Sequence, residues 1–146
     1  MRTHLFTYGT LQISSIFQRV AGHLFTAQNA VLDGYMCCCV RGEVYPGIKP
    51  FYGAQTSGKL YLHVTLPALK RLDFFEGDFY KRIQTRVRLT NGTMVNAHVY
   101  CIQKKYRPVL STQPWHIADF TNQKQTHFLT AYPFMPVHHT KGLPNV

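Results

Sequence analysis

Acidic residues are scarce in this sequence, which holds six Asp and Glu against sixteen Lys and Arg, for a formal net charge of +10. Such a charge suits partners that carry phosphates or carboxylates. The basic residues are scattered along the chain, however, and gather into no dense arm or repeat. This distribution is typical of a solvated basic surface and argues against a nucleic-acid partner.

Long apolar runs are also missing, although apolar residues make up 45% of the chain. No run approaches the length that a membrane span needs. The first residues lack the apolar segment and the small-residue cleavage site of a signal peptide. The chain holds no internal repeat or low-complexity segment. We therefore expect one domain, a cytoplasmic location and no membrane partner.

Cysteine is limited to four residues, Cys101 and the consecutive Cys37, Cys38 and Cys39. This spacing matches neither a disulfide framework nor the paired ligands of a zinc site. Free cysteine behaves as a small apolar residue. We expect these thiols to be packed against neighbouring side chains rather than to bind a metal.

What the sequence does contain is a series of short β-forming segments separated by turn signals. The expected strands are His4–Thr7, Leu24–Ala27, Tyr35–Val40, Thr56–Val64, Tyr80–Leu89 and Thr93–Ile102. Asp33–Gly34 predicts a turn, and Asn91–Gly92 predicts a tight hairpin. The prolines of Tyr45–Pro50 predict a loop, because proline disrupts helices and central strands. The remaining segments are Ile13–Val20, a short helix or irregular; Lys104–Pro114, a connection; and Trp115–Phe120, a single helical turn.

The first expected strand ends in a sharp turn, Tyr8-Gly9-Thr10, that leads into Leu11. Glycine lets a ligand approach the main chain, and amides that point outward at such a turn form an anion-binding nest. The alternative is an ordinary tight turn capped by Thr10.

The one well-defined helix is expected over Leu66–Phe75, with Gly77 as its breaker. At about 100° per residue, Asp73 and Glu76 project among the leucines of the inner side. An inward carboxylate is hydrogen-bonded, is ion-paired, or has a raised pKa, and a raised pKa near neutrality suits a general acid or base. Each acid therefore has a catalytic and a structural alternative.

Tyr80 and Arg82 lie two residues apart in an expected strand and so share a face. Arg82 is suited to hold a substrate carboxylate through two hydrogen bonds. The alternative is a structural ion pair with Asp73 or Asp78. Three phenylalanines near Glu76 are candidates for the wall of an apolar pocket or for ordinary core: Phe74, Phe75 and Phe79.

Taken together in this order, several segments resemble the gamma-glutamylcyclotransferase-like family, which includes the gamma-glutamylamine cyclotransferases and the plant avirulence-induced (AIG2-like) proteins. The matching segments are Leu5–Leu11, Tyr45–Ile48, Gly58–Tyr61, Leu72–Arg82 and Trp115–Phe120. The resemblance implies an α+β fold, a small mixed β-barrel with a few short helices, over residues 1–122. We expect the tail, residues 123–146, to pack on the same domain through Phe128, Tyr132 and Phe134.

The resemblance also implies a reaction in which the α-amine of a γ-glutamyl amide attacks its own γ-carbonyl and releases 5-oxoproline and a free amine. Glu76 is the implied catalytic residue, and no metal or cofactor is implied. The implied substrate-binding residues are Tyr8, Gly9, Thr10, Leu11, Tyr45, Pro46, Gly47, Tyr80 and Arg82. A buried glutamate fits this chemistry, because an ammonium must lose a proton before it attacks.

Three functions are consistent with the sequence. The first is this cyclisation, with a small-molecule γ-glutamyl substrate and Glu76 as the proton shuttle. The second is a small-ligand-binding or regulatory member of the family without turnover. The third is nucleic-acid binding, which only the net charge favours.

Overall fold

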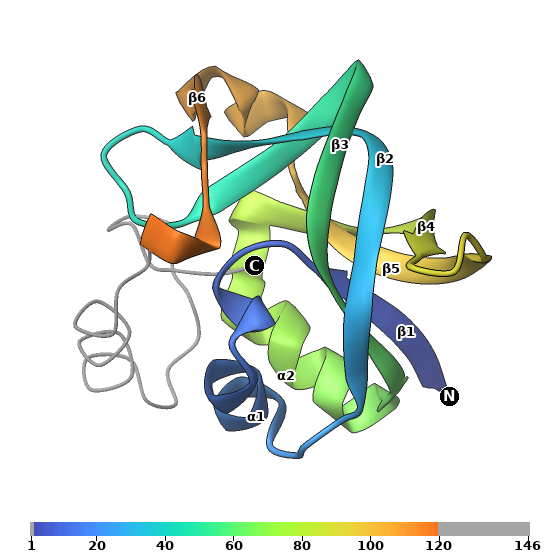
Figure 1. Cartoon of the computed structure of the whole chain (residues 1–146). Helices are drawn as coiled ribbons and strands as arrows, with labels where there is room; N and C mark the ends of the chain where they lie inside the picture. Colours follow the sequence, from blue (N-terminus) through green and yellow to red (C-terminus); the bar gives the residue numbers. More distant parts are fainter. Residues whose placement is uncertain (1, 120–146) are drawn as a thin grey trace.

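The computed structural model describes residues 2–119, and Figure 1 shows the course of the chain. Within these residues the strands are β1 (Arg2–Thr7), β2 (Ala27–Val40), β3 (Pro46–Thr65), β4 (Tyr80–Leu89), β5 (Met94–Ile102) and β6 (Leu110–Pro114). The α-helices are α1 (Ser14–Ala21) and α2 (Leu66–Glu76). The 3₁₀ turns are η1 (Thr10–Gln12), η2 (Gly77–Phe79), η3 (Lys104–Val109) and η4 (Ile117–Asp119). The tail expected to pack on the domain, and the boundary at residue 122, lie outside the described residues.

Five of these strands close into a barrel. The sheet order is β3-β1-β5-β4-β2-β6, and β2 also pairs with β3. β1 runs parallel to β5, with Leu5 opposite His98, whereas the other neighbouring pairs are antiparallel. Closure pairs the edges that an open sheet would expose. The expected α+β fold, a small mixed barrel with short helices, is confirmed.

Helices α1 and α2 lie side by side at one end of the barrel (Figure 1). Phe17 of α1 stacks on Tyr61 of β3, with ring centroids 3.6 Å apart. The Arg71 guanidinium of α2 donates to the Ala21 carbonyl at 3.3 Å. The apolar side chains of both helices and of the strands form one core. This packing fixes α2 relative to β3 and to the turn after β1.

Helix α2 forms as the sequence predicts. It follows Thr65, has Pro67 in its first turn, and ends where Gly77 adopts a φ of 69°. Its inner leucines, Leu69 and Leu72, are fully buried. Phe74 is 66% exposed, so the expectation that it walls an apolar pocket near Glu76 is wrong, because the helix turns this side chain outward.

The turn expected at Asp33–Gly34 is instead a bulge inside β2, and the strand expected at Leu24–Ala27 begins only at Ala27. The pairing of β2 with β3 shifts register between Asp33 and Tyr35, and Gly34 has a φ of 85°. Glycine at a positive φ permits a bulge as readily as a turn. One long strand therefore spans what the sequence predicts as a turn.

The loop expected over Tyr45–Pro50 is also wrong, because Pro46–Thr65 forms the continuous strand β3. Pro46 is the first residue of this strand, and Pro50 pairs with Tyr35 beside the β2 bulge. Strand ends and bulges tolerate a residue without an amide hydrogen. The hairpin at Asn91–Gly92 is confirmed, since β4 and β5 pair on either side of it. Strand β6 lies where the sequence predicts only a connection.

None of the helices between residues 2 and 119 is both long and apolar enough to cross a bilayer.

Candidate functional site

Glu76 is the last residue of α2, and its side chain is 0% exposed. Its inward position confirms the prediction from helical spacing. The chain reverses directly after it, because Gly77 leaves the helical region with φ 69° and ψ −152°. The only glutamate of α2 is therefore carried into the interior by the end of a helix.

The turn after β1 is held by hydrogen bonds to its main chain and to Tyr8. The Tyr8 hydroxyl donates to the Tyr100 carbonyl at 2.6 Å. The Tyr61 hydroxyl donates to the Leu11 carbonyl at 2.8 Å, and the Gln12 amide side chain donates to the Tyr8 carbonyl at 2.8 Å. Tyr8, Thr10 and Leu11 are nearly or fully buried. The turn thus lies within the protein, where the sequence predicts outward-pointing amides.

Glu76 and this turn lie within electrostatic reach of each other. Burial raises the pKa of Tyr8, Tyr80 and Tyr100 well above the ordinary value, and repulsion from the Glu76 carboxylate adds to the rise at each of the three tyrosines. The charge of Glu76 thus acts on tyrosines of the turn, of β4 and of β5. Two segments far apart in the chain are brought within electrostatic reach of this carboxyl group.

The start of β3 is tied to the same region by Tyr80, whose hydroxyl donates to the Pro46 carbonyl at 2.7 Å. The ring of Tyr45 packs edge-on against Phe79, with centroids 6.4 Å apart. Gly47 faces another way, since a Cβ at this position would lie 3.2 Å from Leu110. Among these three predicted residues, Pro46 is the one that is hydrogen-bonded to Tyr80.

Arg82 forms the ion pair that the sequence offers as its structural alternative. Its Nε donates to Oδ1 of Asp73 at 2.8 Å, and its Nη2 donates to Oδ2 at 3.1 Å. The Tyr100 hydroxyl donates to the same Oδ1 at 2.6 Å. A third guanidinium nitrogen, Nη1, contacts Nδ1 of His98. Each nitrogen of Arg82 is thus in contact with the protein, which differs from the predicted role as a free clamp for a substrate carboxylate.

A cavity of about 250 Å³ lies at the end of α2, where Gly77 lines it and the preceding residue, Glu76, does not. It is lined by Asp73, Gly77, Tyr80, Arg82 and Tyr100. Its volume is slightly below the roughly 300–1,000 Å³ of drug-sized sites, which is appropriate for a small polar ligand. The cavity brings the predicted residues Tyr80 and Arg82 together, whereas the turn Tyr8–Leu11 does not line it.

Comparison with known proteins identifies the family. The profile of the family described as gamma-glutamyl cyclotransferase, AIG2-like, matches residues 5–117. This chain belongs to that family. AIG2-like protein C of Arabidopsis thaliana is 31% identical over 132 residues, which cover 87% of this chain and 74% of that protein. The chain therefore has a cyclotransferase-like fold, and members of this family are generally enzymes that act on small molecules.

Solved structures share the fold of this AIG2-like chain. A solution structure of a protein from Arabidopsis thaliana matches with a TM-score of 0.71 at 22% identity and covers 90% of this chain and 80% of that one. The crystal structure of an AIG2-like protein from Mus musculus matches with a TM-score of 0.57 at 26% identity, over 79% and 86% of the two chains.

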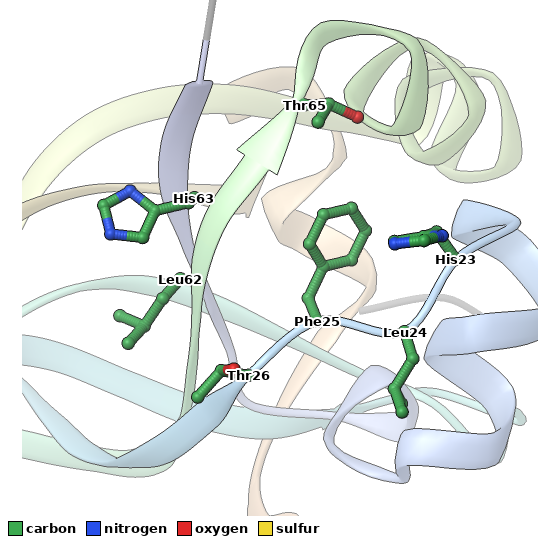
Figure 2. Close-up of a pocket in the computed structure, with 7 residues that line it drawn as sticks. All are labelled: His23, Leu24, Phe25, Thr26, Leu62, His63 and Thr65. Atoms are coloured by element: carbon green, nitrogen blue, oxygen red, sulfur yellow. The ribbon is translucent and has the colours of Figure 1, made fainter.

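A second cavity of this AIG2-like barrel, of about 350 Å³, lies where the segment before β2 meets the end of β3. Figure 2 shows its lining, with the rings of His23 and Phe25 close together and His63 on the neighbouring strand. The lining residues are His23, Leu24, Phe25, Thr26, Leu62, His63 and Thr65. It contains no carboxylate and none of the predicted site residues, so the cavity at the end of α2 is the better candidate.

The cysteines are packed as the sequence predicts. Cys38 and Cys101 are buried, Cys37 and Cys39 are half-buried, and none of the four forms a disulfide. The Cys101 thiol donates to the Ile48 carbonyl at 3.3 Å. Residues 2–119 contain no cluster of three or more His, Cys, Asp or Glu side chains arranged to bind a metal ion.

Tyr100 and His98 are site residues that the sequence reasoning missed. In β5 they share a face, and Tyr100 pairs directly with Arg82 across the hairpin. A two-residue Asn-Gly turn would pair residue 90 with residue 93 and so place Cys101 opposite Arg82. The loop instead holds three residues, 90–92, with Leu89 bonded to Thr93, and this shift of one residue, which the sequence did not signal, sets Tyr100 opposite Arg82.

We expect His98 to make the fold less stable in acid. A guanidinium only donates hydrogen bonds, so His98 accepts at Nδ1 and must be neutral. Burial, together with the positive charge of Arg82, lowers the pKa of His98 below its ordinary value, although Asp73 opposes this shift. The unfolded chain therefore binds a proton at a higher pH than the folded chain, and folding free energy is lost as the pH falls below about 6.5.

Thermal unfolding of wild type and His98→Gln from about pH 7.5 to about pH 5 measures this effect. The midpoint of the variant is expected to fall less over that range. A residual slope is expected from His4, whose pKa is also lowered, first by burial and then by His63. Equal slopes for the two proteins would show that His98 is not the titrating group.

Proposed function

We propose that this protein is a γ-glutamyl cyclotransferase-type enzyme that cyclises a γ-glutamyl amide to 5-oxoproline and releases a free amine. The α-amine nitrogen attacks the γ-carbonyl carbon, a new C–N bond forms, and the bond to the leaving nitrogen breaks. Two protons leave the α-ammonium nitrogen as it becomes the lactam N–H, and both go to the leaving nitrogen, which departs as an ammonium ion, so atoms and charge balance without water, oxidant or cofactor. The reaction needs a proton shuttle, donors for the oxyanion or carboxylate, and a site that holds the chain curled.

The observation that carries the proposal is the position of Glu76. Its carboxyl group is 0% exposed, yet it lies next to Gly77, which lines the 250 Å³ cavity. A carboxylate removed from water in this way is suited to accept the α-ammonium proton and then to pass it to the leaving nitrogen. Glu76 is the residue proposed for this proton transfer.

The turn Tyr8–Leu11 is proposed to bind the substrate through its main chain. The start of a 3₁₀ turn leaves amide hydrogens without acceptors inside the turn itself. The bonds from Tyr61 to the Leu11 carbonyl and from Tyr8 to the Tyr100 carbonyl fix the turn before substrate arrives. Pre-positioned donors stabilise a developing oxyanion without reorganisation during the reaction.

Tyr80, with its hydroxyl on Pro46, is proposed to form the wall that keeps the glutamyl chain folded. Holding the α-amine near its own γ-carbonyl supplies an entropic contribution to the rate. Arg82 is proposed to act on the same cavity through Asp73 rather than as a free clamp. The end of α2 leads through η2 directly into the start of β4 (Figure 1).

Incubation of the purified full-length protein with a panel of γ-glutamyl amines and γ-glutamyl dipeptides tests the proposal. Release of 5-oxoproline with an equal amount of amine is the expected result. Binding of these compounds without product would instead assign the protein as a ligand-binding member of the family. The absence of both binding and turnover at millimolar concentrations of these compounds would overturn the proposal.

A further inference from the structure

Tyr100 makes two hydrogen bonds that reach opposite sides of the candidate site. Its hydroxyl donates to Oδ1 of Asp73 on α2 at 2.6 Å, and its carbonyl accepts from the Tyr8 hydroxyl at 2.6 Å. We infer that Tyr100 is a positioning residue that holds the helix bearing Glu76 and the Tyr8 turn at a fixed separation. This inference rests on the proposed function, since it names a determinant of the same site.

The hydrogen bond from Tyr100 to Asp73 acts on α2 close to Glu76. Asp73 lies three residues before Glu76, so the two side chains leave neighbouring turns of one helical face. Any movement of the end of α2 that carries Glu76 also moves Asp73. The bond from Tyr100 therefore limits displacement of Glu76 relative to β5.

The turn side is equally constrained. Tyr8 and Tyr100 are each 2% exposed, so water cannot replace the bond between them. Loss of this bond would leave the buried Tyr8 hydroxyl without a partner and would cost its full desolvation penalty. The bond therefore keeps the Tyr8 ring in place. The ring of Tyr8 in turn sets the direction of the main chain at Gly9.

Arg82 completes the arrangement on the Asp73 side. Its two bonds to the carboxylate fix both oxygens, and β4 holds Arg82 directly opposite Tyr100. Asp73 thus has one orientation in which it accepts from Arg82 and from Tyr100 together. The three side chains form one hydrogen-bonded unit, in which Tyr100 is buried and the side chains of Arg82 and Asp73 are 24% and 40% exposed.

A matched pair exists elsewhere on β4 and serves as the control. Arg88 contacts Asp33 through the same two-bond geometry, at 3.2 and 3.1 Å, but at an exposed position away from Glu76. Tyr52, which is fully exposed on β3, is the control for loss of a hydroxyl. Neither residue belongs to the proposed site.

The first test is a double-mutant cycle on 5-oxoproline release with Tyr100→Phe, Asp73→Asn and the double variant. Each single change is expected to lower kcat by about tenfold with little change in KM, because positioning is lost rather than a substrate contact. The double variant should be no slower than the worse single variant. Asp33→Asn and Tyr52→Phe should match wild type.

Two kinetic results would overturn the inference. If the two losses multiply, Tyr100 and Asp73 act independently. If KM rises while kcat stays unchanged, Tyr100 contacts the substrate and does not position Glu76. Both measurements are made well below the thermal midpoints of the variants, as determined by circular dichroism, so that global unfolding does not contribute.

The second test needs no turnover and separates this inference from the proposed function. Amide hydrogen exchange of residues 8–12 is measured in wild type, Tyr100→Phe and Asp33→Asn. Exchange in Tyr100→Phe is expected to be about tenfold faster, with Asp33→Asn unchanged. If the wild type makes no 5-oxoproline but this difference is found, the proposed function fails and the connection stands. Equal exchange in all three proteins would overturn the connection.

Discussion

Replacement of Glu76 by glutamine is expected to lower kcat for 5-oxoproline release by about 10²–10⁴-fold, the usual range for loss of a general acid or base. Glutamine retains the volume and the hydrogen-bonding oxygen of glutamate, but it cannot take a proton from the α-ammonium. The measurement is steady-state release of 5-oxoproline from the best γ-glutamyl substrate.

The control for this change is Asp78→Asn, which removes an exposed carboxylate two residues further along the chain. Activity close to wild type is expected for it. Far-UV circular dichroism establishes that both variants are folded. Wild-type turnover by Glu76→Gln would remove the proton shuttle from the mechanism and would leave the turn amides as the main contributors.

Substitution of Gly58 by alanine is expected to destabilise the fold by about 3 kcal/mol, the upper part of the range for an overpacked core. A Cβ at this position would lie 2.1 Å from the Thr7 carbonyl oxygen and 2.8 Å from the Phe6 ring. The first of these contacts is with main chain, which cannot rotate away. β1 must therefore separate from β3 or the turn that follows Thr7 must move.

Urea unfolding at neutral pH measures the change in the free energy of unfolding, with Ser57→Ala as the control. Ser57 is the exposed neighbour of Gly58 on β3, so its replacement is expected to change stability little. If Gly58→Ala is folded at the assay temperature, its kcat should also fall, because the shift is transmitted to Tyr8. A stability equal to wild type would show that β1 and β3 are not in such close contact.

Sequence reasoning reached the β4–β5 hairpin and the position of Glu76 because each depends on local signals. Helical spacing and a glycine breaker define the end of α2, and Asn91–Gly92 defines the β4–β5 hairpin. The resemblance to the family supplied the closure of the barrel, which no local pattern encodes. The structure of residues 2–119 confirms the closure of the barrel and the inward position of Glu76.

The errors share one physical cause, which is that tertiary pairing overrides local preference. Asp33–Gly34 has the composition of a turn, but pairing along the whole of β2 converts it into a bulge. The prolines of β3 are accommodated at a strand start and beside that bulge. Neither outcome follows from the local sequence, because both depend on which strand lies opposite.

The polar part of the site was predicted only in part. The pairing of Arg82 with Asp73 was one of the stated alternatives, whereas the position of Tyr100 opposite Arg82 depends on a three-residue loop that an Asn-Gly signal does not specify. The third bond, from Tyr100 to Asp73, depends on how α2 packs across the barrel. Distances between a helix and a sheet follow from side-chain packing, which sequence periodicity does not determine.

The central claim is that Glu76 and the Tyr8 turn face one small ligand. A crystal structure of the protein with bound 5-oxoproline tests it most directly. The predicted result is a carboxylate or carbonyl oxygen of the ligand on the amides of residues 9–11, with the ring nitrogen within hydrogen-bond distance of the Glu76 carboxyl group. Binding of 5-oxoproline in the groove between His23 and Thr65, or anywhere else that leaves Glu76 without contact to the ligand, would contradict it.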